Sequence, residues 1–242
     1  MADIKKGDIV RMNYDAYIAD TDKLYDTTNA DKAKEAEIFD EKYTYAPMPY
    51  IVGSGKLFKV LDEAIAAAKV GEETTVEIAP KDGAGEKNPK LIEIHTVGEF
   101  LKQGIRPYPG LTVKLGDRNG IIETVGAGRV KVDFNNPLSG KNLKYVFTIT
   151  EEVKDEKEKV AAVIQMDFGT SEGFDCEITK DKVSVKVADI VKFNQNWLMS
   201  KFRIVNDLRD VLGVDTIEFV EVWEKPADKS ADKADKKADK KE

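Results

Sequence analysis

The chain has 242 residues, of which 41% are hydrophobic and 34% are charged, and its formal net charge is −7. This length exceeds the roughly 100–200 residues of a typical domain, so two or three small domains are expected. The negative charge argues against nucleic acid as the main partner, because binding phosphates requires a clustered basic surface.

Residues that form metal sites or disulfides are scarce. His95 and Cys176 are the single histidine and the single cysteine, whereas a structural zinc site usually takes four such ligands, so we expect no metal. A lone cysteine forms no internal disulfide, which favours a reducing compartment. The chain opens without a charged-then-apolar leader and has no run of about 18 apolar residues. We therefore expect a cytoplasmic protein that does not bind membranes.

The N-terminal part predicts a sheet with a helix beside it. Residues 9–18 alternate loosely between apolar and polar side chains, which indicates a strand, and residues 31–38 have the composition of a short helix. Residues 56–69 place their apolar side chains on one helical face, and Ser54 is expected to cap that helix. Residues 72–79 alternate again and predict a second strand.

Short strands separated by turns are predicted for the middle of the chain. Thr96 is followed three positions later by Glu99, which is the spacing of a capping box and predicts a short helix through Gln103. Beyond it, the patterns predict four strands, over residues 111–115, 120–125, 129–134 and 142–150.

The C-terminal part predicts a separate module. The charge run at residues 151–159 has no apolar face and marks a domain boundary. A long helical pattern over residues 188–212 then lies among strand patterns, which indicates an α+β domain. The strand patterns cover residues 161–168, 182–187 and 216–223. The repeated Ala-Asp-Lys of residues 225–242 predicts a disordered tail.

Five short motifs, in order, resemble the FKBP family of peptidyl-prolyl cis/trans isomerases. The motifs are Gly7 to Tyr14, Leu24 to Thr28, Tyr50 to Gly53 with the helix that follows, Val70 to Glu73, and Leu143 to Phe147. The resemblance implies an α+β fold in which an antiparallel sheet forms a half-barrel wrapped on one helix. It also implies an enzyme that works on X-Pro bonds and needs no cofactor.

Two further stretches resemble the SlyD type of this family, in which a small β-rich chaperone domain is inserted. Residues 89–93 look like the entry to that insert and residues 132–143 like its exit. The insertion at 28–49 and the extra C-terminal module are similar to long-type archaeal FKBPs. The expected domains are residues 1–86 with 140–150 for the isomerase, 87–139 for the insert, 151–224 for the C-terminal domain, and 225–242 for the tail.

The resemblance also implies which side chains form the site. Isomerisation is opposed by amide resonance, a barrier of about 18–20 kcal/mol, and an apolar pocket that favours the twisted amide lowers it without a nucleophile. The expected catalytic residues are Tyr14, Asp26, Phe58 and Tyr145. The expected pocket lining is Tyr25, Met48, Leu57 and Leu61.

One position departs from the family pattern. Ala84 stands in Gly83-Ala84-Gly85, where relatives usually carry an aromatic residue whose hydroxyl bonds the substrate. We therefore expect a wider pocket at Ala84 and lower activity. On the insert, unfolded segments are expected to contact Phe100, Leu101, Ile105 and Tyr108.

Several alternatives stay open on the sequence. Leu57 and Leu61 also suit a plain buried helix face, and Asp26 suits a turn cap. The leading function is an isomerase and chaperone for unfolded or nascent polypeptides that contain X-Pro bonds. The alternatives are a holding chaperone with little isomerase activity, because of Ala84, and an adaptor that uses residues 151–224 for a fixed partner. A homodimer through that C-terminal domain is a further candidate.

Overall fold

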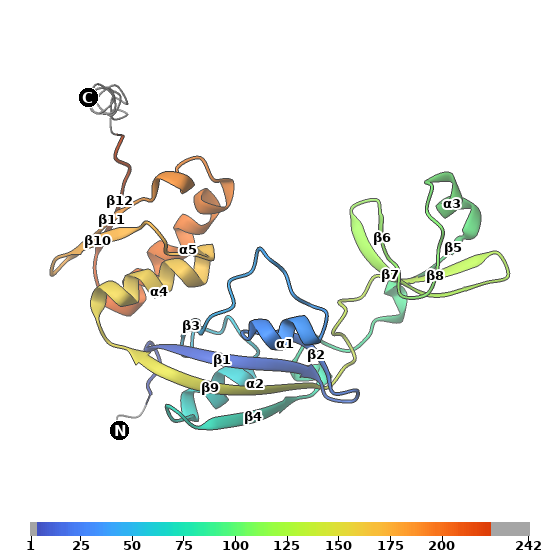
Figure 1. Ribbon diagram of the computed structural model, residues 1–242, viewed down its shortest axis with the longest axis horizontal. Helices are drawn as coiled ribbons and strands as arrows, with labels where there is room; N and C mark the ends of the chain where they lie inside the picture. The colour runs from blue at the N-terminus through green and yellow to red at the C-terminus, as the bar shows by residue number, and fades with distance from the viewer. Residues whose placement is uncertain (1–3, 224–242) are drawn as a thin grey trace, which may run out of the picture. The chain divides into compact units, whose positions relative to one another are not determined.

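The computed structural model describes residues 4–223, and the chain divides after Val153 into two compact units. The first unit holds a sheet with its helices and a second, smaller sheet; the other unit holds a third sheet (Figure 1). The predicted tail at residues 225–242 lies outside the described residues.

The main sheet of the first unit is antiparallel and has five strands, in the order β2-β1-β9-β4 with β3 also paired to β1. Its strands are β1 (Ile9–Ile18), β2 (Lys23–Thr27), β3 (Met48–Ile51), β4 (Glu73–Ile78) and β9 (Leu143–Val153). The central strand β1 pairs with β9 along its length, while its other edge pairs first with β3 and then with β2. The sheet stays open, so the predicted half-barrel and α+β class are confirmed.

The helix α2 (Lys59–Ala67) packs its apolar face on this sheet. Leu61 and Ile65 are its buried residues, one turn apart, as the sequence spacing predicts. The predicted cap at Ser54 is wrong, because the helix begins after Phe58 and has no side-chain cap. Instead, Asp62 accepts the backbone N–H of Gly53 at 2.8 Å, which ties the preceding turn to the first helical turn.

A second helix lies in the 28–49 insertion. The helix α1 (Ala30–Glu35) begins where the Asn29 side chain accepts the N–H groups of Asp31 and Lys32. It ends at Glu35, and two residues later Glu37, with a φ of 58°, turns the chain back so that the N–H of Ile38 bonds the carbonyl of Ala33. The segment that follows returns to the main sheet as β3.

The insert forms its own four-stranded antiparallel sheet, in the order β5-β8-β7-β6. Its elements are β5 (Ile92–Thr96), α3 (Val97–Lys102), β6 (Thr112–Leu115), β7 (Arg118–Gly126) and β8 (Arg129–Asp133), after two short 3-10 turns at Pro80–Asp82 and Pro89–Leu91. The Thr96 side chain accepts the N–H of Glu99, so the predicted cap of α3 is confirmed. The strand β5 was not predicted.

The two ends of the insert meet at its base. The N–H of Gly140 donates to the carbonyl of Gly85 at 2.8 Å, and the Ser139 hydroxyl donates to the carbonyl of Ala84 at 3.0 Å. Lys87 forms an ion pair with the largely buried Asp133, with 2.6 Å between Nζ and Oδ2. These contacts bring the entry and exit of the insert together.

The second unit is a three-stranded sheet with two long helices. The elements are α4 (Glu156–Phe168), β10 (Asp175–Ile178), β11 (Lys182–Lys186), a 3-10 turn (Asp189–Val191), α5 (Gln195–Leu212) and β12 (Thr216–Val220). The strands β11 and β12 are parallel, with α5 as the crossover between them. This arrangement confirms an α+β module.

Two predicted elements of this unit are wrong. The strand expected at residues 161–168 is part of α4, because Asp155 caps a helix there and Gly169 ends it in the left-handed conformation. An apolar run this short does not by itself distinguish a strand from a buried helix. The helix expected from residue 188 begins only after Asn194, whose side chain accepts the N–H groups of Asn196 and Trp197.

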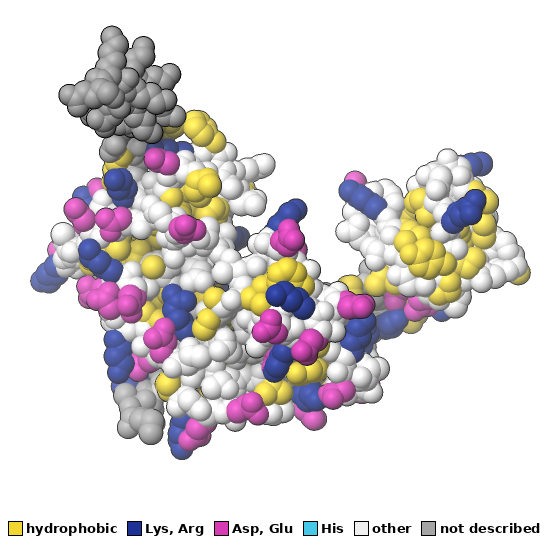
Figure 2. All heavy atoms as spheres, in the orientation of Figure 1, with side chains coloured by type: hydrophobic (Ala, Val, Ile, Leu, Met, Phe, Trp, Pro, Cys, Tyr) yellow, Lys and Arg dark blue, Asp and Glu magenta, His cyan; other side chains and the backbone are white. Residues whose placement is uncertain are grey.

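Not every apolar residue of the predicted C-terminal helix is buried. Trp197 and Leu208 of α5 are buried, as expected, but Leu198 and Phe202 on the same helix are exposed. Hydrophobic side chains are visible on this unit in Figure 2. Among residues 4–223, no helix combines the length and the apolar character that a membrane crossing requires.

Candidate functional site

Strand register gathers the expected site residues on one face of the main sheet. Tyr14 of β1 lies opposite Phe147 of β9, and the next inward position of β1, Ala16, lies opposite both Tyr145 and Asp26. Directly opposed residues share a face because side chains alternate along each strand. The register of three strands therefore places Tyr14, Asp26 and Tyr145 next to one another.

An apolar hollow opens between this face and the start of α2. Its volume is ≈ 70 Å³, several times the roughly 10–15 Å³ that one water molecule needs. Leu61, which is 2% exposed, packs into the core beneath it. The lining residues are Met12, Tyr14, Asp26, Met48, Leu57, Leu61, Tyr145 and Phe147.

A hydrogen bond joins the two polar groups of this hollow. The Tyr14 hydroxyl donates to Oδ2 of Asp26 at 2.8 Å. Burial, followed by the nearby Asp26 carboxylate, raises the pKa of the Tyr14 phenol. Tyr14 therefore stays protonated and keeps the Asp26 carboxylate fixed in the wall.

A second pair of hydroxyls lies beside the first. The Tyr25 hydroxyl donates to that of Tyr145 at 2.7 Å, and the two rings meet edge to face with centroids 6.3 Å apart. The Phe58 ring also meets the Tyr145 ring edge to face, with centroids 6.4 Å apart. Because Tyr145 accepts in this bond, its own proton remains available to a ligand in the hollow.

Two other expected residues, Phe58 and Ala84, lie at the start of α2 and near the base of the insert. Phe58 is the N-cap of α2, so its backbone N–H is not used by the helix and can meet a ligand carbonyl. Ala84 is half-buried near the base of the insert and is not among the residues that line the hollow. The hollow therefore has no side-chain wall at the position where relatives usually carry an aromatic residue.

The insert residues expected to bind clients do not all reach the surface. Leu101 and Tyr108 are exposed, and Ile105 is partly buried against the small core. Phe100 is 0% exposed and lies in that core with Val113 and Ile122, so its assignment to client binding is corrected. On an amphipathic helix as short as α3, the inward and outward positions are adjacent in sequence, which explains the error.

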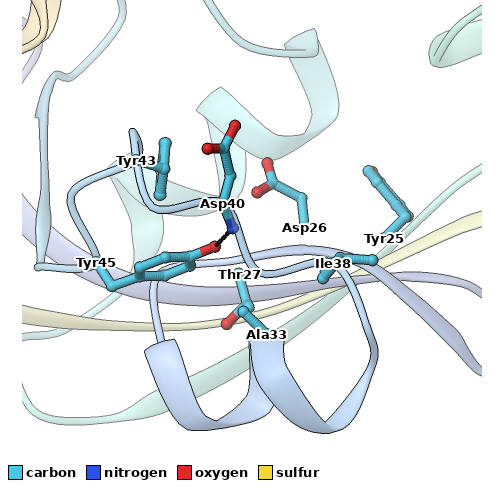
Figure 3. Close-up of a pocket in the computed structure, with 8 residues that line it drawn as sticks. All are labelled: Tyr25, Asp26, Thr27, Ala33, Ile38, Asp40, Tyr43 and Tyr45. Atoms are coloured by element: carbon cyan, nitrogen blue, oxygen red, sulfur yellow. Dashed lines mark hydrogen bonds between the residues drawn. The ribbon is translucent and has the colours of Figure 1, made fainter.

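Sequence reasoning missed a second hollow next to the first. It has a volume of ≈ 180 Å³ and shares Asp26 with the apolar hollow. Figure 3 shows its lining from β2 and from the insertion, with Tyr43 and Tyr45 beside Asp40. Three aromatic residues within Phe39 to Tyr45 were the available signal for it. The lining residues are Tyr25, Asp26, Thr27, Ala33, Ile38, Asp40, Tyr43 and Tyr45.

The chemistry available here is binding rather than bond breaking. The apolar hollow offers hydrocarbon and aromatic walls, a carboxylate, and hydroxyl donors at fixed positions. Within residues 4–223, no three histidine, cysteine or acidic side chains gather as metal ligands would. Such a hollow suits a small apolar ring with an adjacent carbonyl group.

Three family models match successive parts of the chain. The model described as FKBP-type peptidyl-prolyl cis-trans isomerase matches residues 2–100. The one described as FKBP26, IF domain matches residues 91–138, and FKBP26_C-terminal matches residues 156–224. Together the matched ranges contain strands β1 to β4 of the main sheet, the strands of the insert and the elements of the second unit, whereas strand β9 lies between them.

Individual proteins are similar to part of the chain. A short-type peptidyl-prolyl cis-trans isomerase of Methanocaldococcus jannaschii is 34% identical over 156 residues, which cover 64% of this chain and 98% of that protein. A probable FKBP-type 16 kDa isomerase of Pseudomonas fluorescens is 28% identical over 119 residues, 47% of this chain and 78% of the relative. The isomerase SlyD of Helicobacter pylori is 26% identical over 129 residues, 50% of this chain and 69% of the relative.

Proposed function

Because the chain belongs to the FKBP-type peptidyl-prolyl cis/trans isomerases, we propose that it catalyses rotation about X-Pro bonds in the hollow lined by Tyr14, Asp26 and Tyr145. We propose further that the insert holds unfolded, proline-containing polypeptides for this reaction. The observation that carries the first proposal is the Tyr14–Asp26 pair in the wall of an apolar hollow. Isomerisation of a proline tetrapeptide, followed without a coupling protease, tests it directly.

The hollow favours the twisted amide in two ways. A planar X-Pro amide carries partial negative charge on its carbonyl oxygen, and this charge separation is lost as the bond twists. Apolar walls solvate the charge-separated planar form poorly. The Asp26 carboxylate, when it faces the carbonyl oxygen, repels the planar form more than the twisted one. Both effects bind the transition state more tightly than the ground state, which is what accelerates a reaction.

Two donors are proposed to orient the bound segment. The backbone N–H of Phe58 and the free proton of Tyr145 can each bond a carbonyl next to the bond that rotates. Neither should bond the rotating carbonyl itself, because a donor there would strengthen amide resonance. Met48, Leu57 and Leu61 then enclose the proline ring.

The absent wall at Ala84 gives a first prediction. Ala84→Tyr should raise kcat/KM for a proline tetrapeptide by about two- to tenfold, since one added hydrogen bond contributes roughly 0.5–1.5 kcal/mol. The assay is the uncoupled peptide isomerisation, and Ala84→Phe is the matched control that adds the ring without the hydroxyl. An unchanged rate in both variants would show that this position is not part of the pocket.

The insert is proposed to bind extended apolar segments. Among the described strands, β5 and β6 each pair with one neighbour, so each has an open edge to which a client can add as a strand. Exposed Ile94, Leu101 and Tyr108 supply apolar contacts, and Figure 2 shows hydrophobic side chains gathered on the insert. Holding a client on the same chain as the pocket raises the effective concentration of its prolines.

The proposed division of labour follows three domains: residues 1–86 with 140–150 for isomerisation, 87–139 for holding, and 151–224 for assembly. The strand β9 continues past residue 150 to Val153, after which the second unit begins. We also propose a cytoplasmic location, which the single cysteine Cys176 supports.

The C-terminal unit is proposed to form a homodimer. Phe193 and Phe202 are 88% and 74% exposed, and Ile190, Leu198 and Met199 are exposed in the same short stretch. Patches of this kind on a soluble domain mark protein interfaces. Phe193→Ser with Phe202→Ser should convert a dimer to a monomer in light scattering after size-exclusion chromatography. A wild-type chain that is monomeric at tens of micromolar would contradict the proposal.

The observations give less support to the two alternative functions, a holding chaperone and an adaptor. A holding chaperone without isomerase activity would not need the fixed Tyr14–Asp26 pair or the open hollow beside it. An adaptor would bind its partner through residues 151–224 alone and would ignore unfolded chains. Binding of a permanently unfolded polypeptide to the full chain separates the adaptor from the proposed function.

A further inference from the structure

The turn between β3 and α2 contains two glycines in the left-handed conformation. Gly53 and Gly55 have φ values of 76° and 69°, which side chains rarely adopt. The start of the turn is fixed, because the N–H of Val52 donates to the carbonyl of Asp8 and the carbonyl of Val52 accepts the N–H of Gly7, both at 2.9 Å. One end of the segment that leads into the helix is therefore tied to the residues just before β1.

A single carboxylate of α2 holds this turn from the other side. Oδ1 of Asp62 accepts the N–H of Gly53 at 2.8 Å, and Oδ2 accepts the N–H of Gly55 at 3.2 Å. The N–H of Asp62 donates to the carbonyl of Phe58 at 2.9 Å, which is the first backbone bond of the helix. Asp62 therefore bonds residues at both ends of the segment 53–58.

Two residues of this segment belong to the proposed isomerase site. Leu57 lines the apolar hollow, and the centroid of the Phe58 ring lies 6.4 Å from that of Tyr145. Phe58 precedes the helix with a φ of −56° and a ψ of 138°, and no side chain caps α2 at this position. The direction of the Phe58 N–H, which is proposed to orient the substrate, is thus set by a segment that Asp62 ties to the helix.

We propose that Asp62 is a positioning residue of the isomerase site, which holds the segment 53–58 so that the Leu57 side chain and the Phe58 N–H face the substrate. This role rests on the proposed function. Asp62 is partly buried and is not among the residues that line the apolar hollow, so it acts through the segment and not on the substrate. A substrate then meets a donor that is already held in place, which reduces the conformational entropy lost on binding.

Loss of this positioning should appear in KM. The Phe58 N–H is proposed to bond a carbonyl next to the rotating bond, so it binds the planar and the twisted amide alike. Weakening such uniform binding raises KM while kcat stays the same. A fall in the folded fraction has the opposite signature, because it lowers the apparent kcat and leaves KM unchanged. The two parameters therefore distinguish a positioning residue from one that only stabilises the fold.

The test measures the isomerisation of a proline tetrapeptide by the full chain. Asp62→Ala removes both acceptor oxygens and should raise KM roughly three- to tenfold, the range of one hydrogen bond, with kcat within about twofold of the wild type. Glu63→Gln is the matched control, because it removes a charge from the next position of the helix. The Glu63 carboxylate is exposed and pairs with Lys59 at 3.8 Å, so KM and kcat of this variant should stay within about twofold.

Amide hydrogen exchange of the same proteins reports on the turn directly. The N–H of Gly53 should exchange slowly in the wild type and at least about tenfold faster in Asp62→Ala, because its acceptor is lost. Asp62→Glu keeps two acceptor oxygens on a longer side chain. It should restore KM to the same extent as it restores slow exchange at Gly53.

Three results would overturn the inference: a KM of Asp62→Ala within twofold of the wild type, a raised KM without faster exchange at Gly53, or an equal rise in KM for Glu63→Gln. An active wild type in any of these cases leaves the proposed function standing, whereas an inactive wild type overturns both. Thermal unfolding shows which variants are folded. If Asp62→Ala is not, Asp62→Asn, which keeps one acceptor oxygen, is judged by the same three results.

Discussion

Replacing Asp26 with asparagine should lower kcat/KM for a proline tetrapeptide by about tenfold or more, which corresponds to at least about 1.4 kcal/mol of transition-state binding. The substitution keeps the shape of the side chain and an acceptor for the Tyr14 hydroxyl. It removes the negative charge that disfavours the planar amide in the wall of the hollow. The measurement is uncoupled peptide isomerisation at saturating and subsaturating substrate.

Asp40→Asn is the matched control for this prediction. Asp40 lines the neighbouring hollow but not the apolar one, so neutralising it should change kcat/KM by less than about twofold. Both variants should unfold within about 1 kcal/mol of the wild type, since neither removes a side chain from the core. Equal activity of Asp26→Asn and the wild type would exclude the carboxylate from the mechanism.

Exposed apolar side chains of the insert should account for most of the protection of unfolded proteins. In the combined variant Ile94→Ser, Leu101→Ser and Tyr108→Ser, suppression of aggregation should fall by more than half, because three exposed apolar contacts are lost. Refolding of a proline-limited protein should slow toward its uncatalysed rate as clients are no longer held near the pocket. Light scattering of a heat-aggregating client and the refolding rate measure the two effects.

A variant of exposed apolar residues on α5 provides the control for the insert variant. Leu198→Ser with Met199→Ser changes exposed apolar residues on α5 instead, and it should leave the protection largely intact. A tetrapeptide is too short to need a holding surface, so its isomerisation reports on the pocket separately from client holding. If the α5 variant loses protection and the insert variant keeps it, clients bind the C-terminal unit, and the proposed role of the insert is wrong.

Local sequence patterns predicted most of the elements in the first unit, for identifiable reasons. β9 alternates clearly and β1 loosely, and α2 places Leu61 and Ile65 one turn apart, so pattern and packing agree. The helix α3 was predicted from a cap whose hydrogen bond the structure contains. Errors arose where the local signal was short, as in the run at residues 161–168 that fits a strand or a buried helix equally.

Sequence motifs identified the expected site residues, but they did not show which of these residues form hydrogen bonds with one another. The sequence places Tyr14 and Asp26 twelve positions apart, and only the register of β1 against β2 brings their oxygens to 2.8 Å. The bond between Tyr25 and Tyr145 spans 120 positions and depends on the same sheet. Long-range pairing of this kind is set by tertiary packing, which leaves no local trace in sequence.

The sequence by itself determined the family, the order of the elements in the first unit, and the residue types around the hollow. The tertiary structure alone decided that Phe100 is core and Leu101 surface, that the Tyr25 hydroxyl meets that of Tyr145, and that the insertion lines a second hollow beside Asp26. The physical reason is the separation along the chain over which each effect acts. Periodicity and caps act over a few residues, whereas burial and hydrogen-bond partners depend on segments that meet only when the whole chain is packed.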